Sequence, residues 1–302
     1  MVTLQTEEMI CPACDGTEWK YAGQAKDFSI SGEWFELREC TGCHLKATHP
    51  QPSADQIGRY YNSSEYISHS DTDAGLTNKL YHKARNFMMK RKYDWVTGAT
   101  NKKTGRLLDI GAGTGHFAKY MQDREWEVVG LEPDEKARQV AAEKLKLHLF
   151  PLDTLSRLRA EHYDVITLWH VLEHVHDLPT MMQQIKTLLT SDGVLFIAVP
   201  NHTSRDAAQY GTQWAAYDVP RHLWHFSPQS IDLLLTKHGL KLAQKITMPL
   251  DAFYVSMLSE KYRENGFLGP ASALFSGIRT LLSGNRDVNK SSSIIYVAKR
   301  IL

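Results

Sequence analysis

The sequence has almost no net charge, few cysteines and no long apolar run. Among its 302 residues, 35 lysines and arginines face 34 aspartates and glutamates, which gives a formal net charge of +1. The chain therefore has no overall field that would attract nucleic acid or an acidic membrane, and we expect no nucleic-acid partner. The unbroken apolar stretches, such as residues 194–199, have the length of a strand and are far too short to span a membrane.

The N-terminal segment lacks the basic start and the apolar run of a secretory signal. We therefore expect a cytoplasmic protein, in which cysteines serve metal binding or catalysis before disulfides. Apolar residues make up 42% and charged residues 23% of the chain, which is an ordinary balance for a globular protein. The length allows one large domain with a small appendage, or two modest domains.

The four cysteines form two Cys-x-x-Cys pairs, Cys11 with Cys14 and Cys40 with Cys43. Each such turn directs two thiolates to one point, and two turns together complete a tetrahedral zinc site. A redox dithiol would need only one pair, and a catalytic zinc would keep an open position that four thiolates fill. The sequence therefore predicts a structural Zn²⁺ in a zinc-ribbon-like module over residues 1–50.

The segment between the cysteine pairs is predicted to form a hairpin, with strands around residues 28–30 and 34–38. Two prolines in three residues end the module. A capping-box pattern then predicts a helix that starts at Ser53, and a second helix is expected from about residue 75 to 96. Residues 51–100 are thus expected to lead into the larger domain, which spans 51–302.

The rest of the chain alternates between short apolar runs and helical segments. Strands are predicted at residues 107–110, 128–131, 147–150, 164–169, 194–199, 241–248 and 293–298. Helices are predicted near residues 116–124, 134–144 and 178–189. This alternation is typical of an α/β fold in which helices cover both faces of a parallel sheet. Ligands of such folds bind beyond the carboxyl ends of the strands.

The loop after the first of these strands carries three glycines at alternate positions, Gly111, Gly113 and Gly115. Without a Cβ, each glycine lets the backbone turn sharply and lets a ligand approach closely. Their spacing departs from the Gly-x-Gly-x-x-Gly of dinucleotide-binding loops. Glu132 stands 21 residues after Gly111, at the end of the second strand, where a carboxylate can accept hydrogen bonds from both hydroxyls of a ribose.

These motifs resemble those of class I S-adenosylmethionine (SAM)-dependent methyltransferases, over residues 80–248 and 291–302. The matching segments are the glycine loop with its flanks (109–117), the end of the second strand (130–133), the residues after the fourth strand (169–177) and the turn into the fifth strand (191–197). Within the superfamily, the chain is similar to small-molecule and glycan-type members often found beside surface-glycan genes. The four-cysteine module resembles that of certain sugar C-methyltransferases. The resemblance implies a doubly wound, seven-stranded Rossmann-like sheet with an antiparallel edge.

The resemblance also implies which residues bind SAM as the cofactor. The three glycines would pass beneath its methionine part, and Asp109 would order their loop. Glu132 would bind the ribose, and Asp153, just after the third strand, would lie at the edge of the adenine. Trp169 and His170 would line the pocket after the fourth strand.

Two groups of residues near this pocket keep both a structural and a functional interpretation. Glu173 and His174 belong to the motif after the fourth strand, but they would also serve to cap or brace the helix that follows. Tyr60, Tyr61 and Tyr66 precede the second expected helix and either pack in the core or cover the cofactor site as a lid. The sequence does not decide between these roles.

The polar and aromatic segment 201–226 leaves the fifth strand and is the expected substrate loop. Methyl transfer to a hydroxyl or to an acidic carbon benefits from a base that takes its proton. His222 is the first candidate for this catalytic base and His225 is the second. Either histidine could instead hydrogen-bond the backbone to shape the loop, and a metal site of both histidines with Asp218 is a further alternative.

A long insert, residues 249–291, separates the last two strands. One of its helical faces is apolar and carries Leu274, Phe275, Ile278, Leu281 and Leu282. This face is expected to pack over the sheet or on a partner subunit, and the alternative is a peripheral membrane contact through residues 267–282. The sequence does not specify the oligomeric state.

The function that these features favour is SAM-dependent methylation of a small-molecule, glycan or lipid-linked acceptor, on oxygen or on carbon. An RNA or protein methyltransferase would use the zinc module to hold its polymer. The neutral chain and the lack of an Asn-Pro-Pro-Tyr-like motif for a planar nitrogen argue against that alternative. A SAM-binding scaffold without activity is the third interpretation, because the glycines and Glu132 indicate binding and not catalysis.

Overall fold

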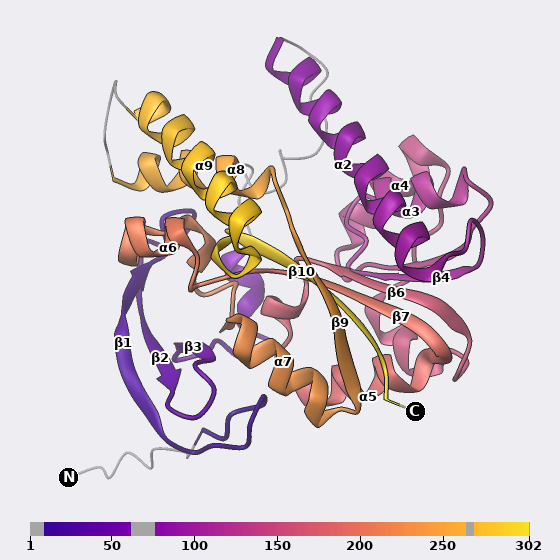
Figure 1. Ribbon diagram of the computed structural model, residues 1–302, viewed down its shortest axis with the longest axis horizontal. Coiled ribbons are helices and arrows are strands. Elements are labelled where there is room, and N and C mark those ends of the chain that lie inside the picture. The colour runs from indigo at the N-terminus through magenta and orange to yellow at the C-terminus, as the bar shows by residue number, and fades with distance from the viewer. Residues whose placement is uncertain (1–8, 62–75, 264–268, 302) are drawn as a thin grey trace.

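A mixed sheet forms the centre of the molecule. The computed structural model describes residues 9–61, 76–263 and 269–301. The central strands are β4 (Arg106–Ile110), β5 (Glu127–Leu131), β6 (Tyr163–Trp169), β7 (Leu189–Pro200), β9 (Leu240–Thr247) and β10 (Ser293–Arg300). They form a six-stranded sheet in the order β5-β4-β6-β7-β10-β9 (Figure 1). The predicted α/β class is confirmed.

Four strands, β5, β4, β6 and β7, run parallel, and β10 runs antiparallel between β7 and β9. The inner strands are apolar along nearly their whole length because both faces of the sheet are buried. In β4, for example, Leu108 and Ile110 belong to one core and Leu107 belongs to the other. Successive side chains of a strand point to opposite faces, so one apolar run supplies both cores.

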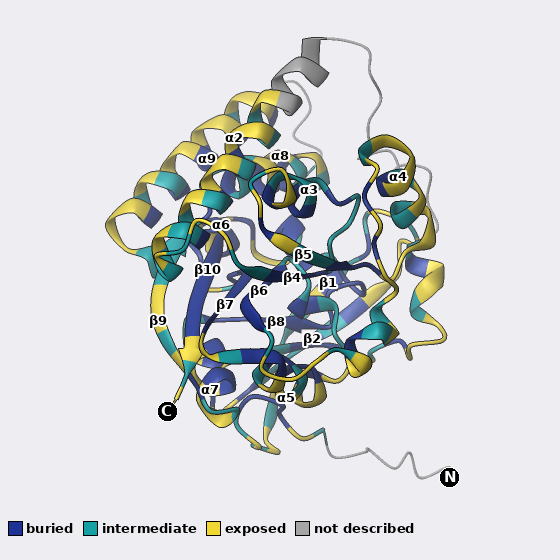
Figure 2. Cartoon of the chain, turned by 90° about the vertical axis from the view of Figure 1, so that its right-hand side faces the viewer, coloured by how far each residue is buried: buried dark blue, intermediate teal, exposed yellow. Residues whose placement is uncertain are grey.

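Helices cover both faces of this sheet. α2 (Leu76–Thr100) and α3 (His116–Gln122) pack on one face, α5 (Leu178–Leu188) and α7 (Pro228–Lys237) pack on the other, and α4 (Glu135–Leu145) packs beside α3. The helices predicted after the first, second and fourth strands are therefore confirmed. Figure 2 shows buried strands in the interior and exposed outer faces on the helices around them.

The strand predicted at residues 147–150 contributes a single bridge, between Phe150 and Leu131. Leu147 and Leu149 turn into a small core between α3 and α4. Their side chains are used for helix packing, and only Phe150 is left to pair with β5. The sheet therefore has six strands where seven were expected.

Short helices complete the described chain: η1 (Ile57–Tyr60), η2 (Leu152–Arg157), η3 (Leu172–His174), α6 (Arg205–Tyr210), η4 (Gly211–Gln213), η5 (Ala215–Tyr217) and η7 (Val288–Lys290). The prediction that a regular helix starts at Ser53 is wrong. The Ser53 carbonyl accepts hydrogen bonds from the N–H groups of Gln56 and Ile57, and this single turn leads into η1. A tight turn with a short 3₁₀ helix takes the place of a regular helix.

A second, antiparallel sheet holds the cysteine module. It consists of β1 (Trp19–Lys26), β2 (Trp34–Cys40), β3 (Lys46–His49) and β8 (Trp224–His225), in that order. β8 comes from the predicted substrate loop, and its His225 pairs with Lys46 of β3. The cysteine module and the substrate loop therefore share one sheet.

The prediction of a strand around residues 28–30 is wrong, because these residues lie in the turn between β1 and β2. Asp27 organises this turn. Its Oδ1 accepts hydrogen bonds from the N–H groups of Ser29 (3.1 Å) and Ile30 (3.2 Å), and its Oδ2 accepts one from Ser31 (2.9 Å). A carboxylate that takes three backbone donors competes with strand pairing and fixes a turn instead.

Arg221 joins this turn to the substrate loop. Its side chain is 1% exposed, and its Nη2 donates to Asp27 Oδ1 (3.0 Å) and to Asp218 Oδ1 (2.7 Å). Its Nη1 donates to the Tyr60 carbonyl (3.0 Å). Burial alone would raise the pKa of Asp27, but the Ser31 N–H and the Arg221 guanidinium outweigh it and lower the pKa below its usual value. The fold therefore holds Asp27 in its charged form.

The insert forms a helical hairpin of α8 (Asp251–Tyr262) and α9 (Gly269–Arg286). Residues 267 and 268 of the predicted contact segment lie outside the described residues. The two helices pack closely, and a Cβ added at Gly277 would lie 2.6 Å from Phe253. The apolar side chains of α9 point outwards, with Leu274 57%, Phe275 62% and Ile278 42% exposed.

The prediction that this face packs over the sheet is wrong, because Leu274, Phe275 and Ile278 are exposed. Contact of this outer face with a partner subunit or a membrane surface stays a prediction. Across the described ranges, none of the helices combines the length and the apolar character needed to cross a membrane.

Replacing Asp27 by Asn should lower the free energy of unfolding by about 3 kcal/mol at pH 7, because it removes one partner of a buried ion pair. Asp27 has a lowered pKa in the folded chain, so its contribution is present above the unfolded pKa of about 3.9 and is lost as the pH falls through the folded value. Urea unfolding at pH 7 and at pH 3 would measure both effects. If the variant and the wild type differ in free energy of unfolding by the same amount at both pH values, Asp27 does not act through its charge.

Candidate functional site

The loop between β4 and α3 carries the three predicted glycines. Gly111, Gly113 and Gly115 have φ angles of +70°, +56° and +79°, which L side chains rarely adopt. A Cβ at Gly111 would lie 2.3 Å from Val171, and one at Gly115 would lie 2.8 Å from Leu147. A Cβ at Gly113 would meet nothing within 4 Å in the described part of the chain. Two glycines thus let the loop pack against its neighbours, and Gly113 leaves an open face for a ligand.

Glu132, at the end of β5, reaches back to this loop. It is 7% exposed, and its Oε2 accepts a hydrogen bond from the Gly113 N–H (2.7 Å) while its Oε1 accepts one from the Asp134 N–H (2.9 Å). Burial raises the pKa of Glu132, and the two N–H groups act against that rise. A ligand that lies against the open face of Gly113 is therefore within reach of a carboxylate.

Asp109 is 1% exposed and accepts a hydrogen bond from Thr167 Oγ1 (2.6 Å) on the neighbouring strand β6. Burial raises the pKa of Asp109 to about 6. This hydrogen bond ties Asp109 to the sheet, so its expected effect on the glycine loop stays a prediction.

Trp169, at the end of β6, faces a buried lysine that the sequence reasoning missed. Lys92 Nζ lies 4.4 Å from the centre of the Trp169 ring and 5.6 Å from that of Phe117. Burial lowers the pKa of Lys92 to about 8. The signal was present in the sequence, because Lys92 follows Met88 and precedes Val96 at intervals of four residues, which places it on the buried stripe of α2. The buried Trp169 Nε1–H has no hydrogen-bond partner among the described residues.

Asp153, predicted at the edge of the adenine, lies in the first turn of η2 with a side chain that is 70% exposed. Its Oδ2 lies 3.9 Å from Arg157 Nη2. The half-buried Leu152 beside it packs against the core. A contact of Asp153 with a ligand stays a prediction.

His170 connects the end of β6 to the insert. Its Nε2 lies 2.9 Å from Asp251 Oδ2, at the start of α8, and its Nδ1 lies 3.3 Å from Glu173 Oε1. Burial acts against protonation, but the Asp251 and Glu173 carboxylates raise the pKa of His170 to about 10. A charged imidazolium therefore links the pocket wall to the insert. The sequence pattern contained no signal that pairs Asp251 with His170.

A cluster of three side chains lies beside this link. Glu173 and His174 come from η3 and His222 comes from the substrate loop, and one ligand atom of each lies within 4.8 Å of the others. His174 Nδ1 lies 3.0 Å from the Arg221 carbonyl and His222 Nδ1 lies 2.9 Å from the Ala216 carbonyl, so both rings donate to the backbone. Burial lowers the pKa of His174 to about 4.

The structure also tests the structural roles that the sequence allowed for Glu173, His174 and His225. Glu173 and His174 do not cap the helix that follows, because Asp177 is the N-cap of α5 and accepts from the Thr180 N–H (3.0 Å). His225 of β8 is 4% exposed, and its Nε2 lies 3.0 Å from Thr48 Oγ1 of the neighbouring strand β3. The structure brings His222 next to His174, a partner that the sequence did not suggest.

The tyrosines before α2, for which the sequence allowed a core or a lid role, have different surroundings. Tyr60 is 1% exposed and packs in the core, edge to face with Phe35 at 5.9 Å between ring centres. Tyr61 Oη lies 3.0 Å from His174 Nδ1 and so reaches the histidine cluster. Tyr66 lies outside the described residues.

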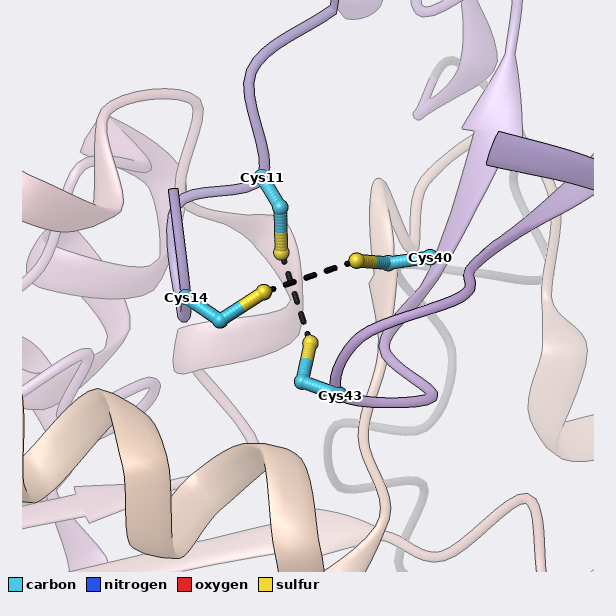
Figure 3. Close-up of side chains that lie close together, drawn as sticks. All are labelled: Cys11, Cys14, Cys40 and Cys43. Carbon is cyan, nitrogen blue, oxygen red and sulfur yellow. Dashed lines mark hydrogen bonds between the residues drawn. The ribbon is translucent and has the colours of Figure 1, made fainter. Parts of the chain in front are cut away.

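The four cysteines converge on one point (Figure 3). Cys11 Sγ lies 3.4 Å from Cys43 Sγ, and Cys14 Sγ lies 3.5 Å from Cys40 Sγ. Zinc–sulfur bonds of about 2.3 Å in a tetrahedron would place the sulfurs about 3.8 Å apart, so the cluster has the size that Zn²⁺ needs. No disulfide joins these four cysteines.

The open face at Gly113 and the adjacent Glu132 carboxylate fit an adenosyl ligand at the carboxyl edge of the sheet. This combination of fold and glycine loop resembles that of class I SAM-dependent methyltransferases. A family model described as a methyltransferase domain matches residues 81–245, more than half of the chain. The chain belongs to this family of methyltransferase domains.

Two curated relatives are ubiquinone biosynthesis O-methyltransferases. The protein from Haemophilus ducreyi is 32% identical over 152 residues, which cover 46% of this chain and 62% of that protein. The protein from Nitrosomonas europaea is 30% identical over 141 residues, which cover 42% of this chain and 57% of that protein. The chain thus spans only about three fifths of the length of these relatives, and the cysteine module lies outside the family match.

Solved structures share the fold at low sequence identity. Magnesium protoporphyrin IX methyltransferase from Synechocystis has a TM-score of 0.51 and 16% identity, with 80% of this chain and 96% of that chain covered. Geranyl diphosphate C-methyltransferase from Streptomyces coelicolor has a TM-score of 0.51 and 12% identity, with 76% and 88% covered. At these identities the likeness concerns the fold alone.

Replacing Glu132 by Gln should weaken binding of S-adenosylhomocysteine by about 100-fold, because the amide loses the charge and one acceptor that the ribose hydroxyls would use. Titration calorimetry measures the affinity. Glu135→Gln, three residues away at the exposed start of α4, is the matched control and should bind like the wild type. Equal affinity in the two variants would remove Glu132 from the binding site.

Thiolate-bound zinc should be present at about one ion per chain and should disappear in Cys43→Ser, because three thiolates no longer close the tetrahedron. Elemental analysis of reduced protein measures the zinc content. Removal of this zinc should also speed hydrogen exchange in β8, which shares the sheet of β3, while α4 keeps its protection. A zinc content that is the same in Cys43→Ser and in the wild type would rule out the cysteine site.

Proposed function

We propose that the protein transfers the methyl group of SAM to an oxygen atom of a small-molecule or glycan-type acceptor, and that His222 takes the proton of the acceptor hydroxyl. The observation that carries the proposal is the position of the histidine pair. His174 is the last residue of η3 and His222 contacts its ring, and η3 follows Val171, whose side chain packs against Gly111 of the glycine loop. The names of the two relatives, which are O-methyltransferases, support oxygen as the acceptor atom.

SAM, when bound, supplies a methyl group activated by a sulfonium. Much of the rate of such a displacement comes from holding the two reactants in line at close range. The glycine loop and Glu132 hold the donor side, and the substrate loop is fixed on the acceptor side by the buried Arg221. The chain would therefore hold both the donor and the acceptor through segments fixed by buried hydrogen bonds.

The hydrogen bonds of His222 suit a proton acceptor. Because its Nδ1–H donates to the Ala216 carbonyl, the neutral ring has its lone pair on Nε2. Asp218 Oδ2 lies 4.0 Å from this Nε2 and would stabilise the imidazolium that forms after proton transfer. His225 lacks this freedom because its Nε2 contacts Thr48. We therefore assign the base to His222.

Replacing His222 by Ala should lower kcat by about 100-fold and leave the affinity for S-adenosylhomocysteine unchanged, since the side chain acts on the acceptor and not on the donor. Transfer of labelled methyl from SAM into a small-molecule and glycan extract measures activity, and calorimetry measures the affinity. His148→Ala, an exposed histidine at the β5 edge, is the control. Full turnover in His222→Ala would eliminate this base, and a wild type that labels no product would argue against the proposed function itself.

A further inference from the structure

The cluster of Glu173, His174 and His222 has features that proton transfer by one histidine does not require. The three side chains come from two separate elements, η3 and the substrate loop, and their ligand atoms lie within 4.8 Å of one another. The two elements are tied together by a hydrogen bond from the Leu223 N–H to the Glu173 carbonyl (2.8 Å). The fold therefore holds one carboxylate and two imidazoles at a common point.

One atom of the cluster lacks a partner. Glu173 is 1% exposed, and its Oε1 faces His170 Nδ1 at 3.3 Å. Its Oε2 is buried and makes no hydrogen bond with any described residue. A buried carboxylate oxygen without a partner is costly, so this atom points to a ligand that would satisfy it.

The two histidines are oriented as metal ligands usually are. Each donates its Nδ1–H to a backbone carbonyl, His174 to Arg221 and His222 to Ala216. A second hydrogen bond of this kind fixes the ring of a metal-binding histidine and leaves its other nitrogen free to coordinate. Two histidines and one carboxylate form a set that binds divalent first-row metals and leaves coordination positions open.

We propose that Glu173, His174 and His222 bind one divalent transition-metal cation, separate from the cysteine-bound zinc, and that its open positions take oxygen atoms of the acceptor. The part that concerns the acceptor rests on the proposed function. Ligand atoms around one ion, with bonds of about 2.1 Å, lie about 3 to 4 Å apart, so binding would close the cluster by about 1 Å. The acceptor class that fits is a molecule with two neighbouring oxygen donors, one of which receives the methyl group.

With the cation bound, His222 Nε2 coordinates the metal and the cation replaces His222 in activating the hydroxyl. His222 acts as the base only while the second site is empty, so the two roles alternate on one nitrogen. A metal-bound hydroxyl has a lowered pKa and releases its proton to solvent. Its oxygen then bonds to the methyl carbon while the carbon–sulfur bond of the sulfonium breaks, which leaves a neutral thioether. Val171 joins the two halves of the site, because it packs on Gly111 and stands two residues before Glu173.

The test counts metal ions in the full chain. Reduced protein with zinc at the cysteines is dialysed against Mn²⁺, and zinc plus manganese per chain is measured. The wild type should hold about two ions, one at the thiolates and one at the cluster. Glu173→Gln and His222→Asn should each weaken uptake of the second ion by about 100-fold, while the thiolate zinc stays. The Asn side chain can still donate to the Ala216 carbonyl, so the loop keeps that contact.

His176→Asn is the matched control, because His176 stands two residues from His174 and contacts the Pro52 carbonyl instead (3.0 Å). It should bind the second ion like the wild type. Affinity for S-adenosylhomocysteine reports that every variant is folded. A wild type that takes up no ion beyond the thiolate zinc, or a second ion retained by both cluster variants, would overturn the proposal.

Activity separates this inference from the proposed function. If the second ion binds and wild-type protein labels no product, the cation site stands and the proposed function fails. If wild-type turnover is the same with the second site filled and emptied, the role of the cation in acceptor activation is overturned and His222 remains a free base.

Discussion

The buried guanidinium of Arg221 holds the two parts of the molecule in register. It pairs with Asp27 from the cysteine module and with Asp218 from the substrate loop, and it also donates to the Tyr60 carbonyl. Such a pair gains little over an apolar contact of the same size, but loss of either partner leaves a charge without compensation. These hydrogen bonds constrain the position of the module relative to the loop. The next residue along the chain is His222, so this constraint also places the candidate catalytic side chain.

The site therefore depends on three segments that are distant in sequence. The glycine loop and Glu132 come from the sheet, Glu173 and His174 come from the short helix after β6, and His222 comes from a loop whose β8 belongs to the sheet of the cysteine module. The cysteine module contributes β3, the strand with which β8 of this loop pairs. This explains why a module without reacting groups of its own belongs to the architecture of the site.

The parts of this arrangement that the sequence predicts are those with local signals. The loop requires positive φ angles at closely spaced positions, and glycines at those positions are a local signal. Glu132 is recognised by its distance from Gly111 and by its position at the end of a strand. The cysteine pairs are equally local, since each turn positions two thiolates. Apolar runs and helical periodicity likewise predict the α/β fold, because burial on both faces of the sheet determines them.

What the sequence does not predict depends on contacts between distant segments. His174 meets His222, and Asp251 meets His170, only because the chain folds back on itself. The turn at Asp27 overrides the apolar character of residues 28–30 through three hydrogen bonds to one carboxylate. Leu147 and Leu149 have the pattern of a strand, but α3 and α4 offer them a core and leave a single bridge. Lys92 can be predicted only in part. Its spacing indicates that it faces inward, but its aromatic partners come from other elements and have no signal in the sequence.

The two sides of helix α9 differ in the size of their side chains. Its inner side is built from residues as small as Gly277 and Gly284, where an added carbon would meet α8 or Ser291 at once, and its outer side carries Leu274, Phe275 and Ile278. The close packing of the small inner residues, and not the large apolar residues outside, therefore holds α9 in place. Substitution of the exposed outer residues should therefore cost little free energy of folding, whereas enlargement of Gly277 or Gly284 should cost much more.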